Sequence, residues 1–304
     1  MANPTVTFGV ILPAWSDAAT PDGFTRVASA AEEAGFDAVW RGDHIVFPEH
    51  IPEGGPFARI DSVAYDVFQI LSHVAAMTDG LHVGTNICVV PYRHPVHLAK
   101  LALTLDNLAE GRFEFGVGVG VHRAEFDVLD VPYEQRGART DEFLELFERV
   151  CRSDTLAFEG PHHEFGRTGF YPRPVRAAGP PIWVGGESSA AVRRVAEYGT
   201  GWTTFHHSPE ELGGMRERLL ATWDDFDRNG EPGLATPVPV CPDRESDPAA
   251  AYLTGDCDHD TRVIEQYLTA GVTRLNVSFR GIPLDHRISL IDRLGEIISS
   301  IEST

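Results

Sequence analysis

Three glycines spaced two residues apart are the most distinctive feature of this sequence. Gly116, Gly118 and Gly120 extend an alternating apolar segment at 112–118. Three polar side chains follow them, His122, Arg123 and Glu125. Glycine is found where the backbone approaches another group closely or adopts a positive φ. Because α/β folds place their chemistry at the carboxyl ends of strands, this segment is the first candidate for a functional site.

The spacing of these glycines excludes a dinucleotide-binding fingerprint. The G-x-G-x-x-G pattern needs glycine at its sixth position, but Val121 stands there when counting from Gly116, and Arg123 when counting from Gly118. A flat ring lying against the glycine backbone is the better hypothesis. The alternative, close packing of the strand inside the fold, explains Gly116 well and Gly120 poorly.

A second candidate site lies at 181–191. This segment reads as a strand, two glycines (Gly185 and Gly186) and then hydroxyl side chains that open a helix. Free backbone N–H groups and the positive end of the helix dipole favour an anion, phosphate above all. Ser188 or Ser189 can cap this helix and contact such a phosphate. Simple N-capping by serine is the alternative.

Asp43 and His44 form an adjacent polar pair after a predicted strand, 37–41. A histidine at the end of a strand can act as a general acid or base near neutral pH. The alternative is a hydrogen-bonded structural pair without a chemical role.

Predicted strands and helices alternate along the whole chain. The strands are 6–12, 37–41, 81–86, 112–118, 181–185, 201–205, 236–241 and 273–279. The helices are 21–34, 62–77, 95–109, 141–151, 188–198, 209–228, 261–270 and 285–301. This alternation indicates a parallel sheet in an α/β protein. Eight such units in a chain of this length predict a (β/α)8 TIM barrel, a single domain over residues 1–304.

Two insertion segments interrupt the barrel pattern, at 155–178 and 230–255. The first reads as a hairpin or a lid, and the second as a polar, proline-rich, exposed segment. We expect substrate-lining residues in the loops 47–56 and 158–171. Polar side chains gather at the carboxyl ends of the predicted strands, and the opposite ends show nothing comparable. No metal centre is expected, because strand 6–12 lacks the H-x-H pair of metal-dependent hydrolases on such barrels.

The charge balance of the chain is strongly acidic. There are 45 Asp and Glu against 25 Lys and Arg, a net charge of −20, and Lys100 is the only lysine. Nucleic acids and anionic membranes are therefore not expected as partners. Adaptation to a salt-rich cytoplasm explains the excess of acids, whereas a GC-rich genome explains only the missing lysines. The four cysteines have no zinc or disulfide spacing, and no signal peptide or membrane span is evident, so we expect a cytoplasmic protein.

Several segments together resemble the luciferase-like monooxygenase superfamily, and within it the branch of coenzyme F420-dependent oxidoreductases. The segments are FGVILP, AEEAGFDAVWRGDH, VGTNICVVPYRHPVHLAKLALTLDNLAEGRFEFGVGVGVHRAEF, EQRGARTDEFLEL and PPIWVGGESSAAVRRVAEYGTGW. The resemblance extends to Trp202, and the remainder of the chain matches only in its order of strands and helices.

This resemblance implies a (β/α)8 barrel that binds a flavin or deazaflavin at the carboxyl ends of its strands. Asp43 and His44 would lie beside the cofactor ring, and the family's non-prolyl cis peptide bond would fall between Asn86 and Ile87. The ring and side chain of the cofactor would lie along Gly118, Val119 and Gly120. Its phosphate would be held by Gly185, Gly186, Glu187 and Ser188.

The branch further implies hydride transfer between coenzyme F420 and a small organic substrate. His44, with Asp43 beside it, is the first candidate for the proton donor and His122 the second. Val121 replaces the tryptophan or acidic residue of relatives, so a sugar phosphate is not the expected substrate. Arg93 and Arg123 are the arginines considered for phosphate contacts.

Two alternatives to F420-dependent hydride transfer stay open. One is an FMN- and O2-dependent monooxygenase, with the insertion at 155–178 as the lid over its site. The other is a non-catalytic flavin-binding protein. Members of the family often dimerise, so we expect a homodimer.

Overall fold

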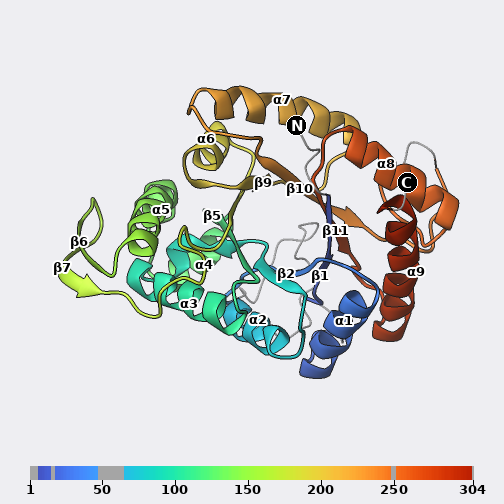
Figure 1. Ribbon diagram of the computed structural model, residues 1–304, viewed down its shortest axis with the longest axis horizontal. Helices are drawn as coiled ribbons and strands as arrows, with labels where there is room; N and C mark the ends of the chain where they lie inside the picture. The colour runs from blue at the N-terminus through green and yellow to red at the C-terminus, as the bar shows by residue number, and fades with distance from the viewer. Residues whose placement is uncertain (1–5, 15–17, 47–64, 248–250, 303–304) are drawn as a thin grey trace.

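The chain folds into a closed barrel of parallel strands surrounded by helices (Figure 1). The computed structural model describes residues 6–14, 18–46, 65–247 and 251–302, and the statements below concern these residues. The barrel strands are β1 (Thr7–Ile11), β2 (Ala38–Arg41), β3 (His82–Thr85), β5 (Phe113–Gly118), β8 (Ile182–Gly185), β9 (Gly201–Thr203), β10 (Gly233–Pro239) and β11 (Arg274–Ser278). Each strand pairs with the next in this order, and β11 pairs with β1 to close the ring. The predicted TIM barrel is confirmed.

Helices surround the barrel, as the sequence pattern predicts. They are α1 (Pro21–Glu33), α2 (Val67–Ala75), α3 (Pro95–Leu108), α5 (Arg136–Arg152), α6 (Ser189–Tyr198), α7 (Pro209–Asp224), α8 (Cys257–Thr269) and α9 (Leu284–Glu302). The start of the helix predicted at 62–77 falls at 62–64, outside the described residues. Within the described ranges, none of the helices combines the length and apolarity needed to cross a membrane.

Two elements differ from the prediction. A short helix, α4 (Arg123–Val128), follows β5 in a stretch for which no element was predicted. The segment 230–255 is not an exposed insertion throughout, because β10 begins at Gly233 and buries Leu234 and Val238 in the core. The expectation of an exposed insertion was wrong for residues 233–239, because glycine and proline, which are typical of loops, stand here in a barrel strand.

The amino-terminal end of the barrel holds a buried ion pair, contrary to the expectation that this end carries nothing comparable to the mouth. Arg274 at the start of β11 forms a two-point ion pair with Glu114 of β5. Trp183 Nε1 donates to the same carboxylate over 2.7 Å, and His82 Nδ1 lies 3.0 Å from it. The guanidinium carbon of Arg274 lies 4.8 Å from the ring centre of Trp40 and 4.2 Å from that of Trp183.

Glycines make room for the two tryptophan rings inside the barrel. A Cβ added to Gly84 would lie 2.2 Å from the Trp40 ring, and one added to Gly201 would lie 2.4 Å from the Trp183 ring. Protein interiors are packed too densely to accept such additions without displacement. The two tryptophans and the ion pair therefore fill the amino-terminal end of the barrel interior. A functional site is expected at the opposite, carboxyl end.

The insertion between α5 and β8 is an antiparallel hairpin of β6 (Thr155–Glu159) and β7 (Glu164–Gly169). Its tip is fastened to α5, because Glu142 accepts a hydrogen bond from His162 N over 2.8 Å and lies 2.7 Å from His163 Nδ1. Figure 1 shows the hairpin at the periphery, outside the ring of helices. The expected hairpin is thus confirmed. It does not cover the barrel mouth, so its expected roles as a lid and as a substrate-lining loop are wrong.

Candidate active site

The segments that follow β2, β3, β5, β8 and β9 meet at the carboxyl end of the barrel, here called the mouth. The backbone of β3 continues through a cis peptide bond between Asn86 and Ile87, as the resemblance implies. It then forms β4 (Cys88–Val89), which pairs with the end of β5. The side chain of Asn86 accepts a hydrogen bond from Thr203 Oγ1 over 3.1 Å. This contact joins the β3 segment to β9 across the mouth.

Close packing against the β3–β4 segment accounts for the spaced glycines of β5. A Cβ on Gly116 would lie 1.8 Å from the carbonyl oxygen of Thr85, and one on Gly118 would lie 2.4 Å from Ile87 Cδ1. Gly120 has a φ of +77°, and a Cβ there would lie 2.6 Å from Val89. The packing alternative therefore explains Gly120 as well as Gly116, and the glycines alone do not require a ring.

The carboxylate of Asp43 is buried and fully engaged by the protein. Arg93 donates to both of its oxygens, over 2.6 and 3.0 Å, and Val89 N donates over 3.0 Å. Arg93 also pairs with Asp66 over 3.0 Å. Asp43 therefore fixes β4 to the end of β2 and does not pair with its neighbour His44. Arg93 is committed to these two carboxylates and is not positioned for a phosphate.

His44 is held by a different carboxylate, that of Glu125. Its Nδ1 lies 2.8 Å from Glu125 Oε2, and the Glu125 side chain is only 1% exposed. The same oxygen accepts from Tyr92 Oη over 2.9 Å. The other oxygen accepts from the backbone nitrogens of Ile45 and Val46, over 2.9 and 3.3 Å. These contacts join the loop after β2 to α4 and to the segment after β4.

These contacts determine the charge of Glu125. Burial alone would raise the pKa of Glu125, but the hydrogen bonds from His44, Ile45 and Tyr92 outweigh it and lower that pKa below its usual value. His122 lies beside His44, with ring centres 5.4 Å apart. Burial, and then the neighbouring His44, lower the pKa of His122 despite the opposing charge of Glu125. At neutral pH the mouth therefore holds an anionic carboxylate and a neutral His122.

The start of α6 has the geometry of an anion site. Ser188 caps the helix by accepting from Ala191 N over 3.2 Å, so the N-capping alternative is confirmed for this residue. Ser188 and Ser189 are nevertheless exposed. Gly186 has a φ of +103°, and its carbonyl accepts from Trp202 Nε1 over 2.6 Å. Exposed N–H groups at this helix end favour a phosphate.

Glu187 lies beside this helix end, but its carboxylate points elsewhere. It accepts from Phe205 N over 3.1 Å and lies 2.6 Å from His207 Nε2. Only the backbone of Glu187 is therefore suited to a phosphate. Arg123, the other arginine considered for that role, pairs instead with Glu134 over 2.5 Å.

The rim of the mouth is apolar. Val121 after β5 is 61% exposed and Phe205 after β9 is 62% exposed. Ile87, between β3 and β4, is partly exposed, and a Cβ on Gly185 would lie 2.9 Å from its side chain. Large exposed apolar side chains at one end of a barrel are typical of a surface that binds an apolar ligand.

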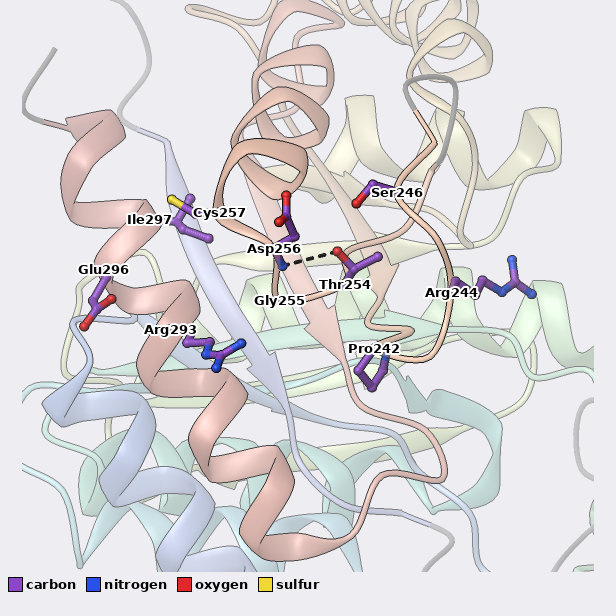
Figure 2. Close-up of a pocket in the computed structure, with 10 residues that line it drawn as sticks. All are labelled: Pro242, Arg244, Ser246, Thr254, Gly255, Asp256, Cys257, Arg293, Glu296 and Ile297. Atoms are coloured by element: carbon purple, nitrogen blue, oxygen red, sulfur yellow. Dashed lines mark hydrogen bonds between the residues drawn. The ribbon is translucent and has the colours of Figure 1, made fainter.

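Two further cavities lie away from the mouth. One, of about 510 Å³, lies between the amino-terminal end of α8 and α9 (Figure 2). Arg293 reaches toward it from α9, whereas Arg244 is directed away from the other lining residues. A second, of about 750 Å³, lies between α3 and the hairpin. Over the described part of the chain, no group of three or more His, Cys, Asp or Glu side chains is arranged to hold a metal ion.

Comparison with known proteins identifies the family. The model of the luciferase-like monooxygenase family matches residues 6–277. The chain belongs to this family. It is similar to an uncharacterized protein of Mycobacterium tuberculosis, with 29% identity over 205 residues that cover 65% of this chain and 69% of the relative.

Solved structures show the same fold. The coenzyme F420-dependent tetrahydromethanopterin reductase of Methanopyrus kandleri superposes with a TM-score of 0.78 at 18% identity, covering 96% of this chain and 98% of that one. A type II Baeyer–Villiger monooxygenase of Pseudomonas putida, in complex with FMN, gives 0.78 at 14% identity, covering 97% and 98%. Members of this luciferase-like family are redox enzymes, and the chain is an oxidoreductase of this class.

Proposed function

We propose that this luciferase-like protein transfers hydride between coenzyme F420 and a small organic substrate at the barrel mouth. The observation that carries the proposal is the meeting of two features at one end of the barrel. One is the apolar rim of Val121 and Phe205, which suits a flat ring. The other is an imidazole, His44, held by a buried carboxylate.

The residues of the mouth fit such a cofactor. The ring would lie over Asn86, Ile87, Gly118, Val119 and Gly120, beside the exposed side chain of Val121. Its phosphate would lie at the start of α6, against the backbone of Gly185, Gly186 and Glu187 and the hydroxyl of Ser188. When bound, the deazaflavin supplies the hydride chemistry, and the protein supplies orientation and electrostatics.

The chain's own residues then divide the remaining tasks. His44 exchanges a proton with the substrate, since it is the imidazole that a carboxylate orients. Asp43 acts indirectly, because it fixes β4 and thereby the peptide between Asn86 and Ile87. His122 is the second candidate for the proton, and burial favours its neutral form.

An FMN-dependent monooxygenase is the second candidate function, since relatives of this fold include one in complex with FMN. Such an enzyme must shelter a reactive oxygen adduct from water. The hairpin assigned to that task packs outside the helices, so we favour hydride transfer. A non-catalytic flavin-binding protein is the third candidate.

These candidates are separated by titrating the purified protein with F420 and with FMN and monitoring the fluorescence of the ligand. We expect F420 to bind at micromolar concentration or below and FMN to bind much more weakly. Binding of FMN alone would favour the monooxygenase, and F420 binding without turnover on any panel of alcohols, aldehydes and ketones would favour the non-catalytic protein. Binding of neither would overturn the proposal. Sedimentation of the same sample tests the proposed homodimer.

A further inference from the structure

The carboxylate of Glu125 accepts hydrogen bonds from two separate parts of the fold, the loop after β2 and the segment after β4. Two donors are backbone nitrogens of Ile45 and Val46, one is the hydroxyl of Tyr92, and one is the imidazole of His44. Glu125 itself stands in the first turn of α4, and the next residue, Phe126, is buried against Val89 and Tyr92. Each oxygen of the carboxylate therefore accepts two hydrogen bonds from the chain itself.

The direction of the His44 hydrogen bond follows from this environment. An ionised carboxylate can only accept hydrogen bonds. His44 Nδ1 must therefore carry the proton in the 2.8 Å contact with Glu125 Oε2. A neutral imidazole has one protonated nitrogen, so the Nε2 of neutral His44 is unprotonated and can only accept a hydrogen bond.

We propose that Glu125 is a positioning residue that fixes His44 as the Nδ1–H tautomer and thereby makes Nε2 the atom that exchanges a proton with the substrate. The part about the substrate rests on the proposed function. The part about the tautomer does not, because it concerns only groups of the chain itself. In this arrangement neutral His44 accepts a proton at Nε2 when a hydroxyl is oxidised, and protonated His44 returns one there when a carbonyl is reduced.

The contacts of Glu125 exceed those that a loop anchor requires. The bonds to Ile45 and Val46 already fasten the loop after β2 to α4 through one oxygen. The second oxygen is given to His44 and Tyr92. The His44 side chain is 15% exposed, whereas the carboxylate side chain that it contacts is 1% exposed. This is the geometry of an oriented general base, in which a carboxylate sets the tautomer of the histidine.

Glu125→Gln tests the tautomer directly. The amide oxygen must face the N–H groups of Ile45 and Val46, because the reverse orientation would oppose donors to donors. The amide NH2 then faces His44 and Tyr92. A hydroxyl can rotate to accept from it, but His44 can accept only by moving its proton from Nδ1 to Nε2. Tyr92→Phe is the matched control, since it removes a donor to the same oxygen without replacing the acceptor that His44 sees.

The measurement is long-range ¹H–¹⁵N NMR of the ligand-free protein labelled with ¹⁵N-histidine, with the His44 signals assigned by their loss in His44→Gln. We expect Nδ1 to be protonated and Nε2 to be unprotonated in the wild type and in Tyr92→Phe. We expect the reverse in Glu125→Gln. The signals of the remaining histidines report whether each variant is folded. A wild-type His44 with the proton on Nε2, or averaging both forms like free imidazole, would overturn the proposal without any variant.

Turnover provides the second arm once F420 and a substrate from the panel are in hand. Glu125→Gln should lower kcat by about 10²- to 10⁴-fold, the usual contribution of a general acid or base, with little change in KM. A tautomer that changes while kcat stays constant would retain Glu125 as the group that orients His44 but reject His44 as the base. If F420 does not bind at all, the NMR measurement still tests the tautomer of His44 independently of the proposed function.

Discussion

The first residue of α6 offers a substitution whose effects on stability and on ligand binding have opposite signs. Ser189→Asp adds a negative charge at the positive end of the helix dipole, so the free energy of unfolding should rise by about 0.3–1 kcal/mol. The same charge should repel a phosphate bound there and raise the Kd for F420 by about tenfold or more. Urea unfolding and fluorescence titration measure the two effects.

Ser189→Asn is the control, because it has the shape of aspartate without the charge and should leave the Kd within about twofold. Equal Kd values for the Asp and Asn variants would place the phosphate elsewhere. A substitution of Gly186 gives a less direct answer, since its φ of +103° strains any L-residue whether or not a ligand binds.

The sequence predicts which residues reach the mouth more reliably than what they touch. Asp43 and His44 were expected there because parallel strands present their carboxyl ends at one face. Their partners could not be read, because Arg93 and Glu125 lie far along the chain and only the closed barrel brings them near. Tyr92 was missed for the same reason. Glu125 was noticed beside the glycines, but nothing in its local sequence indicated a histidine partner.

Among the elements, periodic apolar segments predict the barrel well and short elements escape prediction. α4 spans Arg123–Val128 and lacks a capping side chain at His122, so neither periodicity nor a cap marks its start. β10 begins with Gly233, which reads as a turn residue. In the fold that glycine is needed in a strand, because a Cβ there would lie 2.5 Å from the Trp183 ring. Requirements of this kind come from packing partners that the local sequence does not contain.

Packing inside the barrel leads to a prediction about two glycines. Gly84→Ala should lower the free energy of unfolding by about 1–3 kcal/mol, because its Cβ would meet the Trp40 ring at 2.2 Å and Arg274 lies against that ring. Gly214→Ala, within α7 and with nothing inside 4 Å of its Cβ, should raise it by about 0.5–1 kcal/mol. Urea unfolding compares the two. A loss at both positions would indicate that backbone entropy does not govern Gly214, and a gain at both would indicate that the barrel interior yields to an added methyl group.

Across the whole molecule, two kinds of charge act on stability in different ways. The net charge of −20 creates repulsion between acidic groups in contact with solvent, and salt screens that repulsion. The Glu114–Arg274 pair is buried among two tryptophans, where salt has little access. High salt should therefore remove the first contribution and leave the second, so acid unfolding in about 1 M NaCl isolates the buried pair.

The pH dependence of that pair has a definite sign. Burial alone would raise the pKa of Glu114, but the hydrogen bond from His82 and the charge of Arg274 lower it from 4.5 to about 2. A carboxyl whose folded pKa is depressed stabilises the fold above its unfolded pKa and loses that contribution as pH falls through the folded value. Glu114→Gln should cost about 3–5 kcal/mol at pH 7, because it leaves Arg274 buried without a counter-charge. The difference in unfolding free energy between wild type and variant, measured with urea in high salt, should hold down to about pH 4.5 and shrink toward pH 2. A difference that is independent of pH over this range would mean that Glu114 contributes through its shape and neutral hydrogen bonds instead of its charge.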